Sequence, residues 1–180
     1  MEQQSGICSP AEEFERVYVE PKPGRALVVG SRVYDGKEDR RMRHADCLGV
    51  DMLDGLGVDR VLNLEDPLPD DIGTFSHVEC ISVLEHSRRP WKLAANLERL
   101  LEPGGTLHVQ APMVWRVHNY PGDYWRFTLD GIRELFPRIQ WHRLAYAHIG
   151  LTVKNKIPTR TRQTYPFFAR TESCGSGVLR

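Results

Sequence analysis

The stretch RALVVGSRVYDGKEDRRMRHADCLGVDMLDGLGVDRVLNLED, residues 25–66, contains three apolar runs that each stop at a turn residue or an acid. Continuous apolar character, without alternation, is typical of strands that are covered on both faces. The runs and the residues that stop them are Ala26–Val29 before Gly30, Cys47–Val50 before Asp51, and Val61–Leu64 before Glu65 and Asp66. We therefore expect three parallel strands, whose carboxyl ends form the edge of the sheet where ligands bind.

The length and the charge of the chain limit its class. The 180 residues and 20.7 kDa suit one ordinary domain. With 24 basic and 24 acidic side chains, the whole chain has no electrostatic preference for nucleic acid or for an anionic membrane. Residues 151–180 nevertheless carry six basic side chains against one acidic, a net charge of +5. Nucleic acid is therefore not expected as a partner, although this basic segment leaves it open.

No targeting or membrane segment is visible in the sequence. No apolar run approaches the ~20 residues that a membrane span requires. Residues 1–6 contain neither a basic segment nor the apolar stretch of a signal peptide. The four cysteines are widely spaced and form no redox or metal motif. We expect a reducing, cytoplasmic location and no membrane partner.

Beyond residue 66, strand and helix signals alternate, which is the pattern of an α/β fold. A fourth strand is expected over Ser76–Leu84 and a fifth over Thr106–Gln110. Pro90 suits the first turn of a helix between them. Leucines then follow at the spacing that gives a helix one apolar face, namely Leu93, Leu97, Leu100 and Leu101. Shorter helices are expected within Ser31–Asp46 and after Thr128, so that helices cover both faces of a Rossmann-like, mostly parallel sheet.

The ends of the chain are expected to differ from this compact domain, which we place at residues 25–153. The breaker cluster Pro21–Gly24 separates it from an arm at residues 1–24 that holds a short helix over Ala11–Val19. Trp141–Val153 is expected to form a terminal antiparallel strand pair. Residues 154–180 are polar and basic, and we expect them to be a flexible tail.

Asp51 is the first candidate for a functional residue. It lies about twenty residues beyond the turn after the first strand, where an acid can accept hydrogen bonds from both hydroxyls of a ribose. A carboxylate suits this task because it accepts hydrogen bonds and donates none. An aspartate at a strand end is equally typical of a simple turn, so this residue alone does not decide between the two roles.

Several short motifs together resemble class I S-adenosylmethionine-dependent methyltransferases, in particular the broad group called type 11. They occur in the order and spacing of that family across about residues 25–145. The motifs are Ala-Leu-Val-Val-Gly-Ser at 26–31, Gly-Val-Asp at 49–51, Asn-Leu-Glu-Asp-Pro-Leu-Pro at 63–69, Ser-Val-Leu-Glu-His at 82–86, Leu-Leu-Glu-Pro-Gly-Gly-Thr-Leu at 100–107 and Tyr-Pro-Gly-Asp-Tyr-Trp-Arg-Phe-Thr at 120–128.

The resemblance implies S-adenosylmethionine as the cofactor and assigns a set of residues to its pocket. The family usually has an acid before the first loop and repeated glycines in it. This chain has Val28, Arg32 and Tyr34 there, whose side chains narrow the approach of the backbone to a cofactor. The expected cofactor-binding residues are Gly30 and Ser31 at the methionine end, Asp51 on the ribose, Met52 on the adenine, Glu65 with Asp66 beside the adenine amino group, and Ile81 and Ser82 along the methionine tail.

The aperiodic, aromatic stretch at residues 113–127 lies where this fold usually places its acceptor loop. We expect His118 and Asp123 to be the catalytic residues, one of them acting as a base if the acceptor is a hydroxyl. The residues expected to shape the acceptor site are Tyr120, Tyr124, Trp125 and Arg126. The alternative is that these aromatic side chains only cover the edge of the sheet.

The sequence thus predicts an enzyme that transfers a methyl group from S-adenosylmethionine to a small-molecule or glycan-like acceptor. A catalytically reduced member of the fold that serves as an interaction module is the alternative, because the glycine loop is altered and the tail is basic. An NAD-dependent dehydrogenase is a third reading, against which the missing G-x-G-x-x-G motif counts. The seven histidines have no recognisable metal spacing, so no metal site is expected, and Glu85 and His86 are interpreted as structural.

Overall fold

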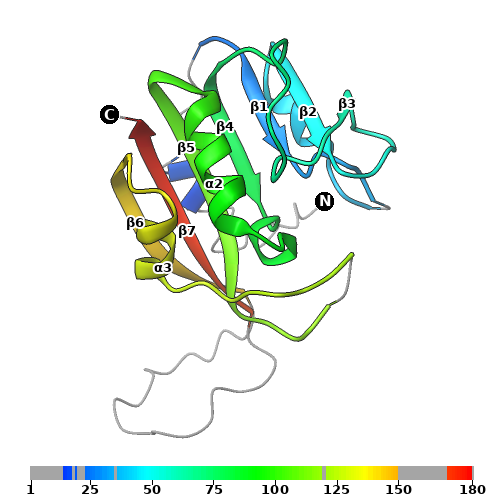
Figure 1. Cartoon of the computed structure of the whole chain (residues 1–180). Helices are drawn as coiled ribbons and strands as arrows, with labels where there is room; N and C mark the ends of the chain where they lie inside the picture. Colours follow the sequence, from blue (N-terminus) through cyan, green and yellow to red (C-terminus); the bar gives the residue numbers. More distant parts are fainter. Residues whose placement is uncertain are drawn as a thin grey trace, which may run out of the picture.

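The computed structural model describes residues 14–17, 19, 23–34, 36–118, 121–149 and 170–179. They form a seven-stranded sheet in the order β3-β2-β1-β4-β5-β7-β6 (Figure 1). The first five strands are mutually parallel, and the last two are antiparallel to their neighbours. Helices flank this sheet, and the expected α/β, Rossmann-like fold with a mostly parallel sheet is confirmed.

The first three strands follow the apolar runs of residues 25–66. β1 (Ala26–Val29) and β2 (Cys47–Asp51) lie where they were expected. β3 is shorter than expected, because it spans only Arg60–Val61 and not Val61–Leu64. Leu64 leaves the edge of the sheet for the core, and its carbonyl accepts a hydrogen bond of 2.8 Å from Asn96 Nδ2. The expected helix within Ser31–Asp46 is the 3-10 turn η1 (Arg40–Arg43).

The middle of the sheet carries the hydrophobic core. β4 (Phe75–Ile81) runs through the 3-10 turn η2 (Leu84–His86) into α2 (Pro90–Leu100), and β5 (Leu101–Val114) follows. α2 crosses in front of β4 and β5 in Figure 1 and buries Leu93, Leu97 and Leu100, as the leucine spacing predicted. β5 begins five residues earlier and ends four later than the expected strand Thr106–Gln110.

The C-terminal part differs from the sequence interpretation. α3 (Leu129–Leu135) starts after Thr128, whose side chain accepts a hydrogen bond from Gly131 N, as expected. Trp141–Val153 was expected to form both strands of an antiparallel pair. Instead, most of it belongs to a single strand, β6 (Ile139–Ile149). It pairs with β7 (Arg170–Leu179), which also pairs with β5 and so lies inside the sheet. The prediction of a flexible tail over residues 154–180 is therefore wrong for residues 170–179. The rest of that range lies outside the described residues.

The N-terminal arm is described only in part. Residues 14–17 are helical, within the expected helix Ala11–Val19, and most of the remaining arm lies outside the described residues. Phe14 stacks on His108 of β5 at 6.4 Å between ring centroids, so this turn packs on the sheet. Among the described helices, none combines the length and the apolar character that a membrane crossing needs.

Candidate functional site

A pocket opens at the carboxyl ends of β1, β2 and β4. The loops that follow these strands supply most of its wall, and η2 and Pro121 close one side. The described residues that line it are Val29, Gly30, Tyr34, Val50, Asp51, Met52, Leu53, Leu62, Asn63, Leu64, Glu65, Ser82, Val83, His86, Ser87, Leu93 and Pro121. The pocket thus lies at the edge of a parallel sheet where such folds bind ligands.

Two residues beside this pocket have a left-handed backbone. Gly30 has φ +69°, and a Cβ built on it would lie 2.5 Å from Val83 Cγ2, so only glycine fits the turn after β1. Ser82 follows β4 and has φ 54°, which is uncommon for a residue with a side chain. Strained backbone of this kind gathers at functional sites, where the surrounding fold holds it in place.

Asp51 presents a carboxylate to the pocket at the end of β2. Its Oδ1 accepts a hydrogen bond of 2.9 Å from Leu53 N, and its Oδ2 accepts one of 3.4 Å from Arg32 N. A carboxylate has about four acceptor positions, so two backbone donors leave capacity for further hydroxyl groups. Arg32 therefore reaches Asp51 through its backbone, while Tyr34 lines the pocket.

The expected cofactor residues divide into two groups. Gly30, Asp51, Met52, Glu65 and Ser82 line the pocket. Among the described lining residues, Ser31, Asp66 and Ile81 do not occur. Asp66 is half-exposed and is held by Arg89 Nη2 at 3.1 Å and by Asn63 Nδ2 at 2.9 Å.

Glu65 holds the turn between η2 and α2. Its carboxylate accepts hydrogen bonds from Ser87 Oγ at 2.9 Å, Arg88 N at 2.8 Å and Arg89 Nε at 3.0 Å. Burial opposes its ionisation, but the hydrogen bonds from Arg89 and Ser87 prevail, and the pKa of Glu65 is lowered. Most of its acceptor capacity is thus used within the protein, so it shapes the pocket wall.

The expected acceptor loop lies on the same side of the sheet as η2 (Figure 1). Tyr124 N donates to the carbonyl of Glu85 at 2.8 Å, and Trp125 Nε1 donates to the carbonyl of Ser87 at 2.9 Å. The Trp125 ring also packs edge-on against Trp91 at 6.0 Å. These contacts fasten residues 121–127 beside the pocket. Tyr120 lies outside the described residues.

The structure brings His118 and Asp123 together, and Arg126 pairs with the same carboxylate. His118 Nδ1 lies 3.1 Å from Asp123 Oδ2, which also accepts a hydrogen bond of 2.8 Å from His118 N. Arg126 pairs with both oxygens of Asp123, with Nη2 at 2.8 Å from Oδ2. Hydrogen bonding by Arg126 outweighs burial and lowers the pKa of Asp123 to about 2. Asp123 is therefore an orienting anion, and His118 remains the candidate base.

His86, which the sequence interpretation took as structural, belongs to the same pocket. It lines the pocket, and its ring meets the ring of His118 edge-on at 4.9 Å. Its Nδ1 contacts the carbonyl of Gly122. Burial lowers the pKa of His86, and that hydrogen bond opposes the effect only in part. Its position after the carboxyl end of the fourth strand was the signal in the sequence that could have identified it.

Comparison with known proteins supports this architecture. The family described as "Methyltransferase domain" matches residues 41–109. No curated protein sequence matches the chain.

Several solved structures are similar in fold. A chain in the complex between the Trm112 methyltransferase activator and a methyltransferase of Haloferax volcanii has 16% identity and a TM-score of 0.61, over 94% of this chain and 88% of that one. The 1,6-didemethyltoxoflavin-N1-methyltransferase of Burkholderia thailandensis, with bound S-adenosylhomocysteine, has 12% identity and a TM-score of 0.59, over 88% and 72%. The N-terminal domain of EvdMO1, in the presence of S-adenosylhomocysteine and D-fucose, has 15% identity and a TM-score of 0.59, over 98% and 85%.

The residues of the pocket fit the cofactor that these proteins imply. Gly30 leaves no room for a Cβ and brings backbone to the pocket, Asp51 keeps acceptor capacity for ribose hydroxyls, and Met52 and Leu53 offer apolar surface for a flat base. Residues 41–109 match the methyltransferase domain family, and the chain has the fold of class I S-adenosylmethionine-dependent methyltransferases, with S-adenosylmethionine as the implied cofactor.

Proposed function

We propose that this chain transfers a methyl group from S-adenosylmethionine to a small-molecule acceptor of glycan-like, hydroxyl-bearing chemistry. The observation that carries the proposal is the pocket at the carboxyl ends of β1, β2 and β4, where Gly30, Asp51 and Ser82 meet. The acceptor would approach from the side of Pro121 and His86, which adjoins His118.

The pocket residues have distinct tasks in this proposal. Asp51 binds and orients the ribose, while Gly30 allows the backbone after β1 to approach the ligand. Ser82 and Val83 fix the loop after β4, and Ser82 N is anchored to the carbonyl of Gln110 at 2.9 Å. When bound, the cofactor supplies an activated methyl group on a sulfonium, so alignment of the acceptor accounts for most of the acceleration.

A hydroxyl acceptor must also lose a proton, and His118 is the residue placed to take it. Asp123 accepts only, so the proton of His118 Nδ1 points to the carboxylate. The lone pair of the neutral ring then lies on Nε2, where it can receive a proton from an acceptor. The arrangement follows the general pattern of a base that an anion orients.

The proposed class of acceptor rests on three supports. The loop at residues 121–127 presents Tyr124 and Trp125, which are partly exposed beside the pocket, and amphipathic rings of this kind suit polar acceptors that have apolar faces. One similar structure is described in the presence of D-fucose, and another has 1,6-didemethyltoxoflavin bound. The third support is the resemblance of the sequence motifs to type 11 methyltransferases, from which we expected a small-molecule or glycan-like acceptor.

The test is transfer of a labelled methyl group. Purified protein would be incubated with S-adenosylmethionine that carries a tritiated methyl group, together with fractionated pools of sugars, nucleotide sugars and other small metabolites. We expect label in a hydroxyl-bearing fraction for the wild type and none for Asp51→Ala. Label confined to a protein or nucleic-acid fraction would contradict the proposed acceptor class.

An interaction module of reduced activity remains the second candidate function, and one observation favours it. Met52, Leu53, Leu56 and Val61 are exposed apolar side chains on and around β3, at the outer edge of the sheet. One similar structure is a complex with a methyltransferase activator protein. If the purified chain binds neither S-adenosylmethionine nor S-adenosylhomocysteine but retains a protein partner, and Val61→Asp releases that partner, the second function is correct.

A further inference from the structure

The two faces of the central strands differ in polarity. On β4 and β5, the side chains of Val78, Cys80, Leu107 and Val109 join the hydrophobic core on the side of α2. Side chains alternate along a strand, so His77, Glu79 and His108 occupy the opposite face. All three are buried there. Buried imidazole and carboxylate groups are costly unless they have partners, so this polar layer requires an explanation.

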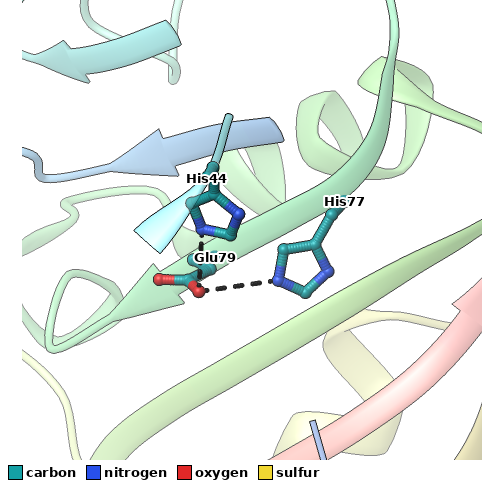
Figure 2. Close-up of side chains that lie close together, drawn as sticks. All are labelled: His44, His77 and Glu79. Carbon is teal, nitrogen blue, oxygen red and sulfur yellow. Dashed lines mark hydrogen bonds and ion pairs between the residues drawn. The ribbon is translucent and has the colours of Figure 1, made fainter. Parts of the chain in front are cut away.

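Two of these residues, His77 and Glu79, converge with His44 on one point, which Figure 2 shows. His44 lies just before β2, and His77 and Glu79 lie on β4. His44 Nε2 is 3.2 Å from Glu79 Oε1, and His77 Nε2 is 3.6 Å from the same oxygen. The side chains of His44, His77 and Glu79 are 10%, 2% and 4% exposed. His77 Nε2 has no hydrogen-bond partner among the described residues, although it is buried and points at this carboxylate.

Hydrogen bonds from surrounding residues direct the ligand atoms of His77 and Glu79 toward one another. His77 Nδ1 lies 2.6 Å from Thr106 Oγ1, a contact that can hold the proton on Nδ1 and leave the lone pair of Nε2 directed inward. Arg40 Nε donates to Glu79 Oε2 at 2.8 Å, so the guanidinium occupies one carboxylate oxygen and leaves Oε1 to the two imidazoles. Partners of this kind behind histidine and carboxylate ligands are typical of metal sites.

The spacing of the three inner atoms also fits a metal. Ligand atoms about 2.0–2.1 Å from a tetrahedral Zn²⁺ lie roughly 3.3 Å apart. The separations of 3.2 Å and 3.6 Å bracket that value, and all three ligand atoms lie within 4.8 Å of one another. We propose that His44, His77 and Glu79 form a buried Zn²⁺ site, with one position left for a fourth ligand.

The role of this site would be to dock the segment before β2 onto the sheet. His44 follows η1, which also reaches Glu15 and Glu79 through Arg40. The ion would join this segment to β4 on the face that α2 does not cover. A ligand that binds only the folded state stabilises it by mass action, so Zn²⁺ would raise the melting temperature. The proposal does not depend on the methyltransferase activity.

Metal analysis of the full chain, freed of any purification tag, is the first test. We expect about one Zn²⁺ per chain after expression with zinc in the medium, loss of the ion to a strong chelator with a fall in melting temperature, and recovery of both on adding Zn²⁺ back. Co²⁺ in its place should give the intense visible absorption of a tetrahedral site. Wild-type protein that contains no Zn²⁺ and binds none at micromolar concentration overturns the proposal.

Substitutions locate the ion. His44→Ala removes a ligand at the periphery of the fold and should weaken Zn²⁺ binding by more than ~100-fold, while Thr106→Val, which removes only the partner of His77, should weaken it by ~10–100-fold. His142→Ala, at an exposed histidine, is the matched control and should leave binding unchanged.

Two neighbouring groups could hold the ion instead, and they are separable. Glu15 and His108 lie near Glu79, and His86 and His118 lie near Glu85. If His108→Gln or His118→Ala abolishes Zn²⁺ binding while His44→Ala retains it, the proposed ligand set is wrong. If His77→Gln fails to fold, the Zn²⁺ titrations of the wild type and of His44→Ala still decide whether the proposed residues bind the ion.

Discussion

His118 Nδ1 lies 3.1 Å from Oδ2 of Asp123, whose side chain is 0% exposed. The carboxylate also pairs with Arg126, so it is a fixed anion beside a partly exposed ring. The two residues that the sequence proposed as alternative bases therefore have different roles. In the proposed function, His118 moves the proton and Asp123 is the positioning residue that holds its ring.

His118→Ala should lower kcat by ~10²–10⁴-fold for a hydroxyl acceptor, because the proton then lacks a base. Cofactor affinity should not change, since His118 does not line the pocket. Asp123→Asn should lower kcat as well and alter the pH profile, because the amide no longer holds the Nδ1 proton in place. Steady-state kinetics with the acceptor found by labelling are the measurement. Full kcat in both variants would show that the loop is only structural.

Asp123 should also contribute to stability in a defined pH window. Hydrogen bonding by Arg126 lowers its pKa from 3.8 to about 2, against the effect of burial. The contribution, about 1–2 kcal/mol, is therefore fully present above pH ~4 and is lost as the pH falls through about 2. Urea unfolding of wild type and Asp123→Asn at pH 7 and pH 3 measures it. A difference between them that grows toward low pH would contradict this assignment.

The role of Gly30 in cofactor binding can be tested by comparison with Gly36, a glycine that has the same left-handed backbone conformation. Gly30→Ala adds the strain of a left-handed residue, about 1–2 kcal/mol, and also places a Cβ 2.5 Å from Val83 Cγ2. Gly36 has φ +75° with nothing within 4 Å of an added Cβ, so Gly36→Ala carries the strain alone. We expect only Gly30→Ala to weaken binding of S-adenosylhomocysteine, and Val83→Ala to restore part of it. Equal affinities in the two alanine variants would remove Gly30 from the site.

β7 should be essential to the fold. Deletion of residues 170–180 removes the strand between β5 and β6 and exposes the edge of β5, so we expect a large fall in melting temperature. Gly177→Ala is a smaller change at the same place, because its Cβ would lie 2.4 Å from Ile139 Cγ2. It should destabilise the protein by ~1–3 kcal/mol through overpacking. A cooperative transition at the wild-type temperature after the deletion would show that β7 is dispensable.

The fold was predictable from sequence wherever burial determines residue type. β1, β2 and α2 lie at the expected places. The apolar runs of the strands and the leucine spacing of the helix indicate which of their faces are buried. β7 was missed because Arg170–Leu179 has little apolar content, and backbone pairing on both sides makes it a strand.

The candidate site was predictable only at single positions. Asp51 and Gly30 belong to a local motif, and the structure places both at the pocket. Glu65 was expected to bind the cofactor, but its carboxylate accepts hydrogen bonds from Ser87 and Arg89. These partners are distant in sequence, so no local motif could predict the contacts. In the same way, no spacing rule joins His44 to His77 and Glu79, because the contact depends on how the segment before β2 folds over β4.

Calorimetric titration with S-adenosylhomocysteine tests the central claim, that the pocket beside Asp51 binds the cofactor. Wild-type protein should bind with one site per chain, and Asp51→Asn should weaken binding by ~10–100-fold, the effect of losing a charge-assisted hydrogen bond of about 1.5–3 kcal/mol. Asp54→Asn, at an exposed acid of the same loop that does not line the pocket, is the control and should bind as the wild type does. No binding by the wild type, or equal affinity in wild type and Asp51→Asn, would contradict the account.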